Sequence, residues 1–271
     1  GFASFAGFAG LASASRAAFS TAAPSITLFS SMYKIADLNV FIENGGTKTE
    51  QRGKKYLYDY DGEPDIKLRQ NKENFPEWYK SHLEKRGYSE KKFSIDDYIH
   101  GLYNTGFSYK ILEHNGCVLH SSAIAVDGNA YLFSAHSGTG KSTHTSLWLD
   151  HFKDRAVIIN DDKPCIREIN GEFYVYGTPW SGKNDLSTND KFKLKGITFI
   201  CRSDDNWIRQ ATKSEAVSLF LTQSYKPTDK EHMELLLNMI DKIFNKVKIY
   251  KLGCNISNEA AKLSYTTMSR G

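Results

Sequence analysis

The stretch SAHSGTGKST, residues 134–143, constrains more than any other what this chain can fold into. The apolar run NAYLFSA leads into it, and STHTSLWLDHF follows with apolar side chains at helical spacing. A strand, a glycine-containing loop and a helix in this order are the setting of a phosphate-binding loop. The usual pattern opens with a glycine, and that position is Ala135 here. We expect alanine to be tolerated there as long as its φ is negative.

The glycines of this loop predict an anion site. Gly138 and Gly140 let consecutive backbone N–H groups turn toward one point at the start of a helix. Lys141 would bring a positive charge to the β- and γ-phosphates, and Ser142 would bring a hydroxyl to Mg²⁺. A glycine-rich turn without a ligand is the structural alternative. The predicted nucleotide-binding residues are Ser137, Gly138, Thr139, Gly140, Lys141, Ser142 and Thr143.

A pair of carboxylates follows the next apolar run. Residues 156–159 predict a strand, and Asn160, Asp161 and Asp162 come directly after it. A strand that ends in carboxylates beside a phosphate loop is an arrangement that holds Mg²⁺. Of two adjacent carboxylates, one can bind the metal while the other accepts the proton of an attacking hydroxyl. The alternative is an Asp-Asp turn that opens a hairpin, since Asn170-Gly171 follows.

The rest of the chain predicts ordinary elements. Asp127-Gly128, between two apolar runs, predicts a hairpin just before the loop. Upstream, YKIADLNVFIEN and KKYLYDYDG predict two strands. A helix is expected from Pro76 to Gly87, and another after a Ser94 cap. We find no functional motif in residues 33–115.

Composition excludes several classes of function. The net charge of +4 comes from interleaved acidic and basic residues, which argues against a nucleic-acid surface. No apolar run approaches the roughly 20 residues that a membrane span needs. The four cysteines are scattered, which favours a reduced, cytoplasmic protein. Residues 1–31 are rich in Ala, Ser, Gly and Phe and contain no acid. We expect them to be a disordered leader or added segment, and residues 32–271 to form a single α/β domain.

The order of motifs resembles a known family. His120, SAHSGTGKS, INDD and YGTPWSGK are similar to the catalytic domain of HPr kinase/phosphorylase, in the phosphoenolpyruvate-carboxykinase-like P-loop group. The similarity is greatest to the shorter relatives, which include kinases of lasso-peptide precursors, and covers about residues 117–265. It implies a mixed β-sheet with flanking helices around the P-loop. It also implies a catalytic set in which His120 lies near the transferred phosphate, Asp161 is linked to the metal, Asp162 deprotonates a serine hydroxyl and Lys141 binds phosphate.

The chain also departs from that family. His136 stands where the loop of HPr kinase usually carries Asp. The glycine- and arginine-rich segment through which that enzyme holds its protein partner and runs the reverse reaction is missing, so HPr is not the expected acceptor. Three further residues are candidates for phosphate contacts, each with a solvent-exposed structural role as the alternative: His136, Lys183 and Arg202.

The sequence therefore predicts an ATP- and Mg²⁺-dependent kinase that transfers the γ-phosphoryl group to a hydroxyl. The expected acceptor is a serine of a peptide or a small molecule. A phosphoenolpyruvate carboxykinase is the alternative enzyme, although no lysine-histidine pair for a second metal precedes the loop. A nucleotide-binding sensor without catalysis is the alternative from another class. No nucleic-acid or membrane partner is expected, and a homo-oligomer is left open.

Overall fold

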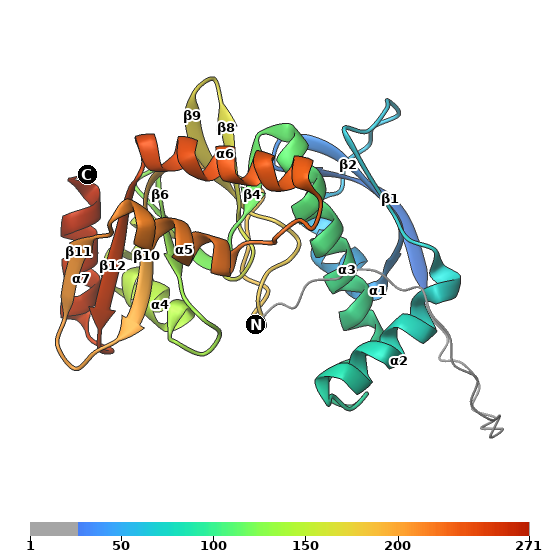
Figure 1. Ribbon diagram of the computed structural model, residues 1–271, viewed down its shortest axis with the longest axis horizontal. Helices are drawn as coiled ribbons and strands as arrows, with labels where there is room; N and C mark the ends of the chain where they lie inside the picture. Colours follow the sequence, from blue (N-terminus) through green and yellow to red (C-terminus); the bar gives the residue numbers. More distant parts are fainter. Residues whose placement is uncertain (1–26, 271) are drawn as a thin grey trace.

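Two β-sheets and the helices around them make up the mixed α/β fold (Figure 1). The computed structural model describes residues 27–270. A nine-stranded sheet carries the predicted phosphate loop, and a separate three-stranded sheet lies near the N-terminus. The expected mixed sheet with flanking helices is confirmed. The strands of the large sheet are β4 (Gly116–Val118), β5 (Ser121–Val126), β6 (Asn129–Ser134), β7 (Ala156–Asn160), β8 (Cys165–Ile169), β9 (Glu172–Tyr176), β10 (Lys191–Arg202), β11 (Trp207–Gln210) and β12 (Lys248–Cys254).

Strand β10 is an interior strand of the large sheet and pairs with three other strands. It runs parallel to β6 along one edge. Along its other edge, its first residues pair antiparallel with β9 and its later residues pair parallel with β12. Strand β5 pairs antiparallel with both β6 and β7, so β6 and β7 run in the same direction. The ends of β6, β7 and β10 therefore lie at one edge of the sheet.

Helices cover both faces of the large sheet. Because side chains alternate along a strand, Ala123 and Ala125 of β5 face one helical layer, while Ile124 and Val126 face the other. The first layer consists of α5 (Lys213–Gln223) and α6 (Lys230–Lys246), whose apolar residues belong to the core. The second consists of α4 (Lys141–Phe152) and α7 (Asn258–Ser269). In residues 27–270, no helix combines the length and the apolar character that a membrane crossing needs.

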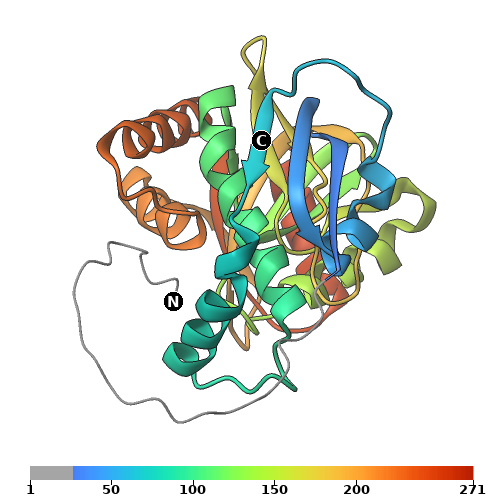
Figure 2. The ribbon, with the colours of Figure 1, turned by 90° about the vertical axis from the view of Figure 1, so that its right-hand side faces the viewer.

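The N-terminal part packs against the large sheet. In Figure 2 strands β1 and β2 face the viewer, with α3 beside them. One buried cluster joins residues of this part to residues of the large sheet; for example, the rings of Phe107 and Trp180 stack at 5.0 Å. The elements of this part are β1 (Leu28–Ile35), β2 (Leu38–Gly46), α1 (Thr47–Gly53), β3 (Ile66–Arg69), α2 (Phe75–Arg86) and α3 (Ile95–Lys110), and short 3-10 turns lie at Lys54–Tyr56, Lys72–Asn74, Ile111–His114 and Lys153–Arg155.

Three expectations for the N-terminal part are wrong. YKIADLNVFIEN is not one strand, because Ala36 and Asp37 have φ of 54° and 63° and turn the chain between β1 and β2. KKYLYDYDG forms a 3-10 turn and a single bridge from Leu57 to Tyr33, not a strand. Strand β1 begins at Leu28, so residues 28–31, which were expected to be disordered, belong to a strand that pairs with β2. The remainder of the expected leader, residues 1–26, lies outside the described residues.

Other local predictions are confirmed. Asp127 and Gly128, with φ of 48° and 79°, form the two-residue turn between β5 and β6. Helix α2 ends at Gly87, whose φ of 64° is left-handed. Helix α3 begins with a capping box in which Ser94 and Asp97 each bind the other's backbone N–H.

Candidate active site

The sheet topology brings the predicted site residues together at one edge. The predicted phosphate-binding loop (residues 135–143) follows the end of β6, and Asp161 and Asp162 follow the end of β7. His120 precedes β5, whose first residue, Ser121, pairs with the last residue of β6. In sheets with parallel strands, ligands bind in the crevice beyond the carboxyl ends of the strands. The loop, the two carboxylates and His120 thus meet at one edge of the sheet.

The backbone of the loop has the geometry that its glycines predict. Gly138 and Gly140 have φ of 78° and 124°, values that other residues adopt at a cost. A Cβ at either glycine would meet no atom within 4 Å, so the backbone angle, not crowding, calls for glycine. The same observation means that the loop faces open space. Ala135 is absent from the positive-φ residues, which agrees with the condition for alanine at the first position.

Lys141 is the first residue of α4, and its side chain folds back over the loop. Its ammonium donates to the carbonyl oxygen of Ala135 at 2.9 Å and lies 3.5 Å from that of His136. The residue is 8% exposed. Burial lowers the pKa of Lys141, while the charge of Asp162 acts in the opposite direction. A buried ammonium beside open space is well placed to interact with an anion.

Asn160 organises the turn that carries the two carboxylates. Its side-chain oxygen accepts hydrogen bonds from the backbone N–H groups of Asp162 at 2.9 Å and Lys163 at 2.7 Å. Its amide nitrogen donates to the carbonyl oxygen of Thr178 at 3.0 Å. Asn160 is fully buried, so this turn is set from inside the protein. The turn directs Asp161 and Asp162 to different neighbours.

Asp162 and His120 form a pair. Imidazole Nε2 of His120 lies 3.1 Å from Oδ1 of Asp162. The side-chain amide of Gln223, at the end of α5, holds the other ring nitrogen at 2.9 Å. The Lys163 ammonium lies 3.6 Å from the same carboxylate oxygen. His120, Asp162 and Gln223 therefore form one hydrogen-bonded group, which the sequence did not predict.

The two carboxylates have opposite pKa shifts. Burial alone would raise the pKa of Asp162, but the hydrogen bond to His120 and the positive charges around it outweigh burial and lower the pKa. For Asp161, burial dominates and, together with the charge of Asp162, raises the pKa, although the Gly182 N–H bonds this carboxylate. Burial lowers the pKa of His120. At neutral pH, Asp162 is thus ionised beside a neutral imidazole.

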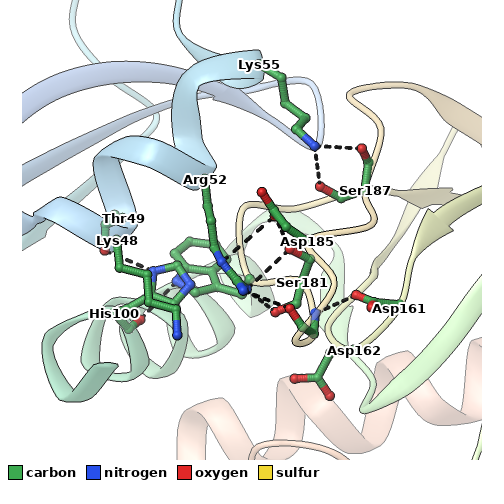
Figure 3. A network of polar contacts seen from close by, with 12 residues as sticks. Lys48, Thr49, Arg52, Lys55, His100, Asp161, Asp162, Ser181, Asp185 and Ser187 are labelled. Carbon is green, nitrogen blue, oxygen red and sulfur yellow. Dashed lines mark hydrogen bonds and ion pairs between the residues drawn. The ribbon is translucent and has the colours of Figure 1, made fainter. Parts of the chain in front are cut away.

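Helices α1 and α3 form the opposite side of the site. Arg52 of α1 donates to the carbonyl oxygens of Ser181 and Gly182, the latter at 2.8 Å (Figure 3). Lys48 pairs with Asp97 of α3. We call the group Lys48, Arg52, Asp97, His100 and Asn104 the helical wall.

The helical wall and the motif residues line one cleft of about 830 Å³. Lys183, which is exposed, lies at this cleft. The residues of this main cleft are Lys48, Arg52, Phe93, Asp97, His100, Gly101, Asn104, His120, Ser137, Gly138, Gly140, Lys141, Ser142, Thr143, Asp161, Asp162, Lys163, Trp180, Ser181, Gly182, Lys183 and Asn184.

The other two candidates for phosphate contacts lie elsewhere. His136 and Arg202 line a second cavity of about 480 Å³ on the far side of the loop, as does Thr139. Ser137 and Gly138 border both spaces. The guanidinium of Arg202 donates to the carbonyl oxygen of Gly138 at 2.6 Å and lies 3.4 Å from that of Thr139. In this arrangement Arg202 supports the loop backbone from behind.

The site fits a magnesium ion that arrives with a nucleotide. Within residues 27–270, His, Cys, Asp and Glu side chains do not gather in threes as a metal site. Mg²⁺ in phosphoryl-transfer sites is held by one or two protein oxygens together with substrate phosphates. Ser142 is exposed at the start of α4, and both Ser142 and Asp161 line the main cleft. The raised pKa of Asp161 means that its carboxylate would gain from a nearby cation.

Sequence reasoning missed the helical wall. Residues 33–115 carry no motif, and Arg52 contacts Ser181 across 129 positions of sequence. Only the contact between the two parts of the fold reveals that α1 and α3 belong to the site. One feature of the sequence pointed to it. GTPWSGK is rich in turn residues, and the backbone groups of such a loop need hydrogen-bond partners from elsewhere in the chain. Trp180 in this loop is buried and its ring stacks on that of Phe107.

Comparisons with known proteins add little. No family model matches the chain, and no curated protein matches it. Among solved structures, the chain is similar to the HPr(Ser) kinase/phosphatase from Coxiella burnetii, with 12% identity and a TM-score of 0.33. The match covers 56% of this chain and 97% of that one. A likeness at this level carries no argument about activity, so the functional conclusion has to come from the site.

Proposed function

We propose that this protein is a kinase that transfers the γ-phosphoryl group of ATP to a hydroxyl group. One observation carries the proposal: an anion-binding loop and an ionised, histidine-paired carboxylate open into the same cleft. A loop alone would support nucleotide binding without chemistry. The carboxylate of Asp162 adds a group that can accept a proton beside the position of the phosphates.

The proposed reaction assigns each group one task. The loop N–H groups and Lys141 bind the β- and γ-phosphates. Asp162 accepts the proton of the acceptor hydroxyl, whose oxygen forms a bond to the γ-phosphorus as the bond to the β,γ-bridging oxygen breaks, which releases ADP. His120 orients the Asp162 carboxylate and keeps it ionised. Mg²⁺, held by Ser142 and Asp161, would neutralise charge on the phosphates.

The second cavity offers a place for the rest of the nucleotide. It borders the loop at Ser137 and Gly138, and Phe199, Ile200 and Leu219 give it an apolar lining. A purine base is flat and largely apolar, and pockets that bind such groups are lined mainly by apolar side chains. We also propose that the protein is cytoplasmic, because the reducing cytoplasm keeps thiols free. The free cysteines are Cys117, Cys165, Cys201 and Cys254.

Two substitutions test the proposal. Lys141→Ala should weaken ATP binding at least tenfold in calorimetry, because a charge-assisted contact to phosphate is lost. Asp162→Asn should keep ATP affinity within about tenfold but slow phosphoryl transfer from labelled ATP by about 10² or more. Lys262→Ala and Asp150→Asn, on exposed positions of α7 and α4, are the matched controls and should behave as wild type.

The outcomes separate the alternatives. Unchanged ATP affinity in Lys141→Ala would remove the basis for a nucleotide protein. Asp162→Asn with normal turnover would favour the sensor without catalysis. A kinase should also make no phosphoenolpyruvate from oxaloacetate with Mn²⁺ and ATP or GTP, since a carboxykinase needs further metal chemistry.

A further inference from the structure

Two polar atoms in the helical wall are buried without a partner. In residues 27–270, the only buried side-chain nitrogens or oxygens without a hydrogen bond are Nε2 of His100 and Oδ1 of Asn104. His100 is 7% exposed. The two residues are one helical turn apart on α3, on the same face, and both line the main cleft. Buried polar groups are nearly always hydrogen-bonded, so these two unpaired atoms, which we call the orphan atoms, need an explanation.

His100 contacts the cleft as a neutral group. Burial, with the charges of Lys48 and Arg52 adding to it, lowers the pKa of His100 to about 3. The hydroxyl of Thr49 lies 3.0 Å from Nδ1 of the ring. Because a hydroxyl can donate or accept, either neutral tautomer is satisfied on that side. Nε2 can therefore donate or accept a hydrogen bond according to what it meets.

The charges of the wall already have partners. Lys48 pairs with Asp97, and Arg52 is occupied by two carbonyl oxygens and, at 3.9 Å, by Asp185. A charged ligand group at His100 would have to be buried against a neutral ring and would gain no free countercharge there. Nε2 of His100 and Oδ1 of Asn104 are consequently suited to binding a neutral polar group.

The wall has a fixed position relative to the carboxylates. The indole N–H of Trp180 donates to the carbonyl oxygen of His100 at 3.0 Å. Two residues later, the N–H of Gly182 donates to Asp161. Residues 180–182 thus connect the orphan atoms on α3 to the carboxylate turn, and Arg52 secures this connection from α1. Figure 3 shows Arg52, Ser181 and Asp161 in this sequence across the cleft.

We propose that His100 and Asn104 bind the acceptor of the reaction, through a neutral group that both donates and accepts a hydrogen bond. This proposal rests on the proposed kinase function. A peptide amide next to a serine has this chemistry, and so does a second hydroxyl of a small polyol. The reacting hydroxyl then points to Asp162 while the second group occupies the wall. Both atoms are buried, so a neighbouring side chain has to move aside as the acceptor binds.

The first experiment compares acceptors. Transfer from labelled ATP is measured with N-acetylserinamide, with glycerol and with ethanol, which has one hydroxyl and no second polar group. We expect the first or the second to exceed ethanol at least tenfold in kcat/KM, because a site with unmatched polar atoms discriminates against a ligand that lacks the matching group. Whichever compound is preferred shows whether the group bound at the wall is a peptide amide or a second hydroxyl. Equal use of all three compounds would overturn the proposal.

Variants locate the preference. Asn104→Leu and His100→Phe should raise the KM for the preferred acceptor about tenfold or more and so reduce its advantage over ethanol, while calorimetry with ATP shows whether the change lies in acceptor binding. Thr105→Val, an exposed position on the same helix, is the control. Wild-type preference in both Asn104→Leu and His100→Phe would overturn the assignment.

A binding measurement separates this inference from the proposed function. The ¹⁵N resonances of the His100 ring are followed by NMR while N-acetylserinamide or glycerol is added without ATP. We expect one of them to shift Nε2 in the wild-type protein and not in Asn104→Leu. If Nε2 shifts but no phosphoryl transfer to either compound is detected, the binding-site proposal stands and the proposed kinase function is wrong. No shift with either compound would refute the site.

Discussion

The hydrogen bond between His120 and Asp162 decides the protonation of the proposed base. Burial of Asp162 raises its pKa, and the imidazole is the largest of the influences that reverse this effect. A carboxylate can accept a proton only when it is ionised, so activity is lost as pH falls through its pKa. With the pKa lowered from 3.8, Asp162 stays ionised throughout the weakly acidic range.

Replacing His120 should therefore move the pH profile. In His120→Asn the effect of burial is opposed only by the lysines, and the pKa of Asp162 rises. We expect wild-type kcat/KM to show no acid limb from Asp162 above about pH 5, while the variant loses activity at a higher pH, by about one unit or more. Rates measured across pH check this, with His151→Asn on the exposed end of α4 as the control. Superimposable profiles would contradict the assigned role of His120.

At the scale of elements, local chemistry determined what the sequence could predict. Ser94, Gly87 and the Asp127-Gly128 pair each fix one backbone conformation through a short-range effect, and all three predictions are confirmed. The turn at Ala36-Asp37 was missed because alanine rarely adopts positive φ. Pairing between β1 and β2 holds it there, and this pairing is not visible in the local sequence.

The phosphate-binding loop gives a prediction at this scale. Gly140 has φ of 124°, and a Cβ there would meet no atom within 4 Å. Gly140→Ala should lower the free energy of unfolding by about 1–3 kcal/mol through backbone strain and weaken ATP binding as the N–H groups turn away. Gly106→Ala is the control, because that glycine lies inside α3 away from the main cleft, a Cβ there would contact Leu68 at an ordinary 3.5 Å, and alanine should stabilise the helix by up to about 1 kcal/mol. Urea unfolding and calorimetry measure both effects; equal stability and affinity in Gly140→Ala would contradict the loop geometry.

For the molecule as a whole, half of the candidate site could be predicted from the sequence. The loop, Asp161 and Asp162 belong to short motifs whose residues are neighbours in the chain. Arg52 and His100 belong to no motif and reach the site only because one core joins the N-terminal part to the large sheet. Such a contact depends on how two sheets pack, which local patterns do not encode.

Arg52 tests whether the two parts act as one. Arg52→Ala should lower the free energy of unfolding by about 1.5–3 kcal/mol, because the carbonyl oxygens of Ser181 and Gly182 lose a charged donor. Arg52→Lys should restore only part of this, since an ammonium cannot reproduce the planar fork. Lys54→Ala, an exposed neighbour, is the control. Urea unfolding followed by tryptophan fluorescence should show one transition in each case; separate melting of the N-terminal part would refute the single core.

The loop of residues 178–187 is held from both sides of the cleft, by Asp161 on one side and by Arg52 and Lys55 on the other; Lys55 donates to Ser187. Because these contacts and a shared core join the two sides of the cleft, we expect the two parts to move as one body. Ligand entry and exit then depend on side chains such as Lys48 and Lys183. Rotamer changes of exposed side chains take picoseconds to nanoseconds, whereas hinge motions of domains take microseconds to milliseconds. Turnover in this protein should accordingly be limited by the chemical step and not by opening, and kcat should depend little on solvent viscosity.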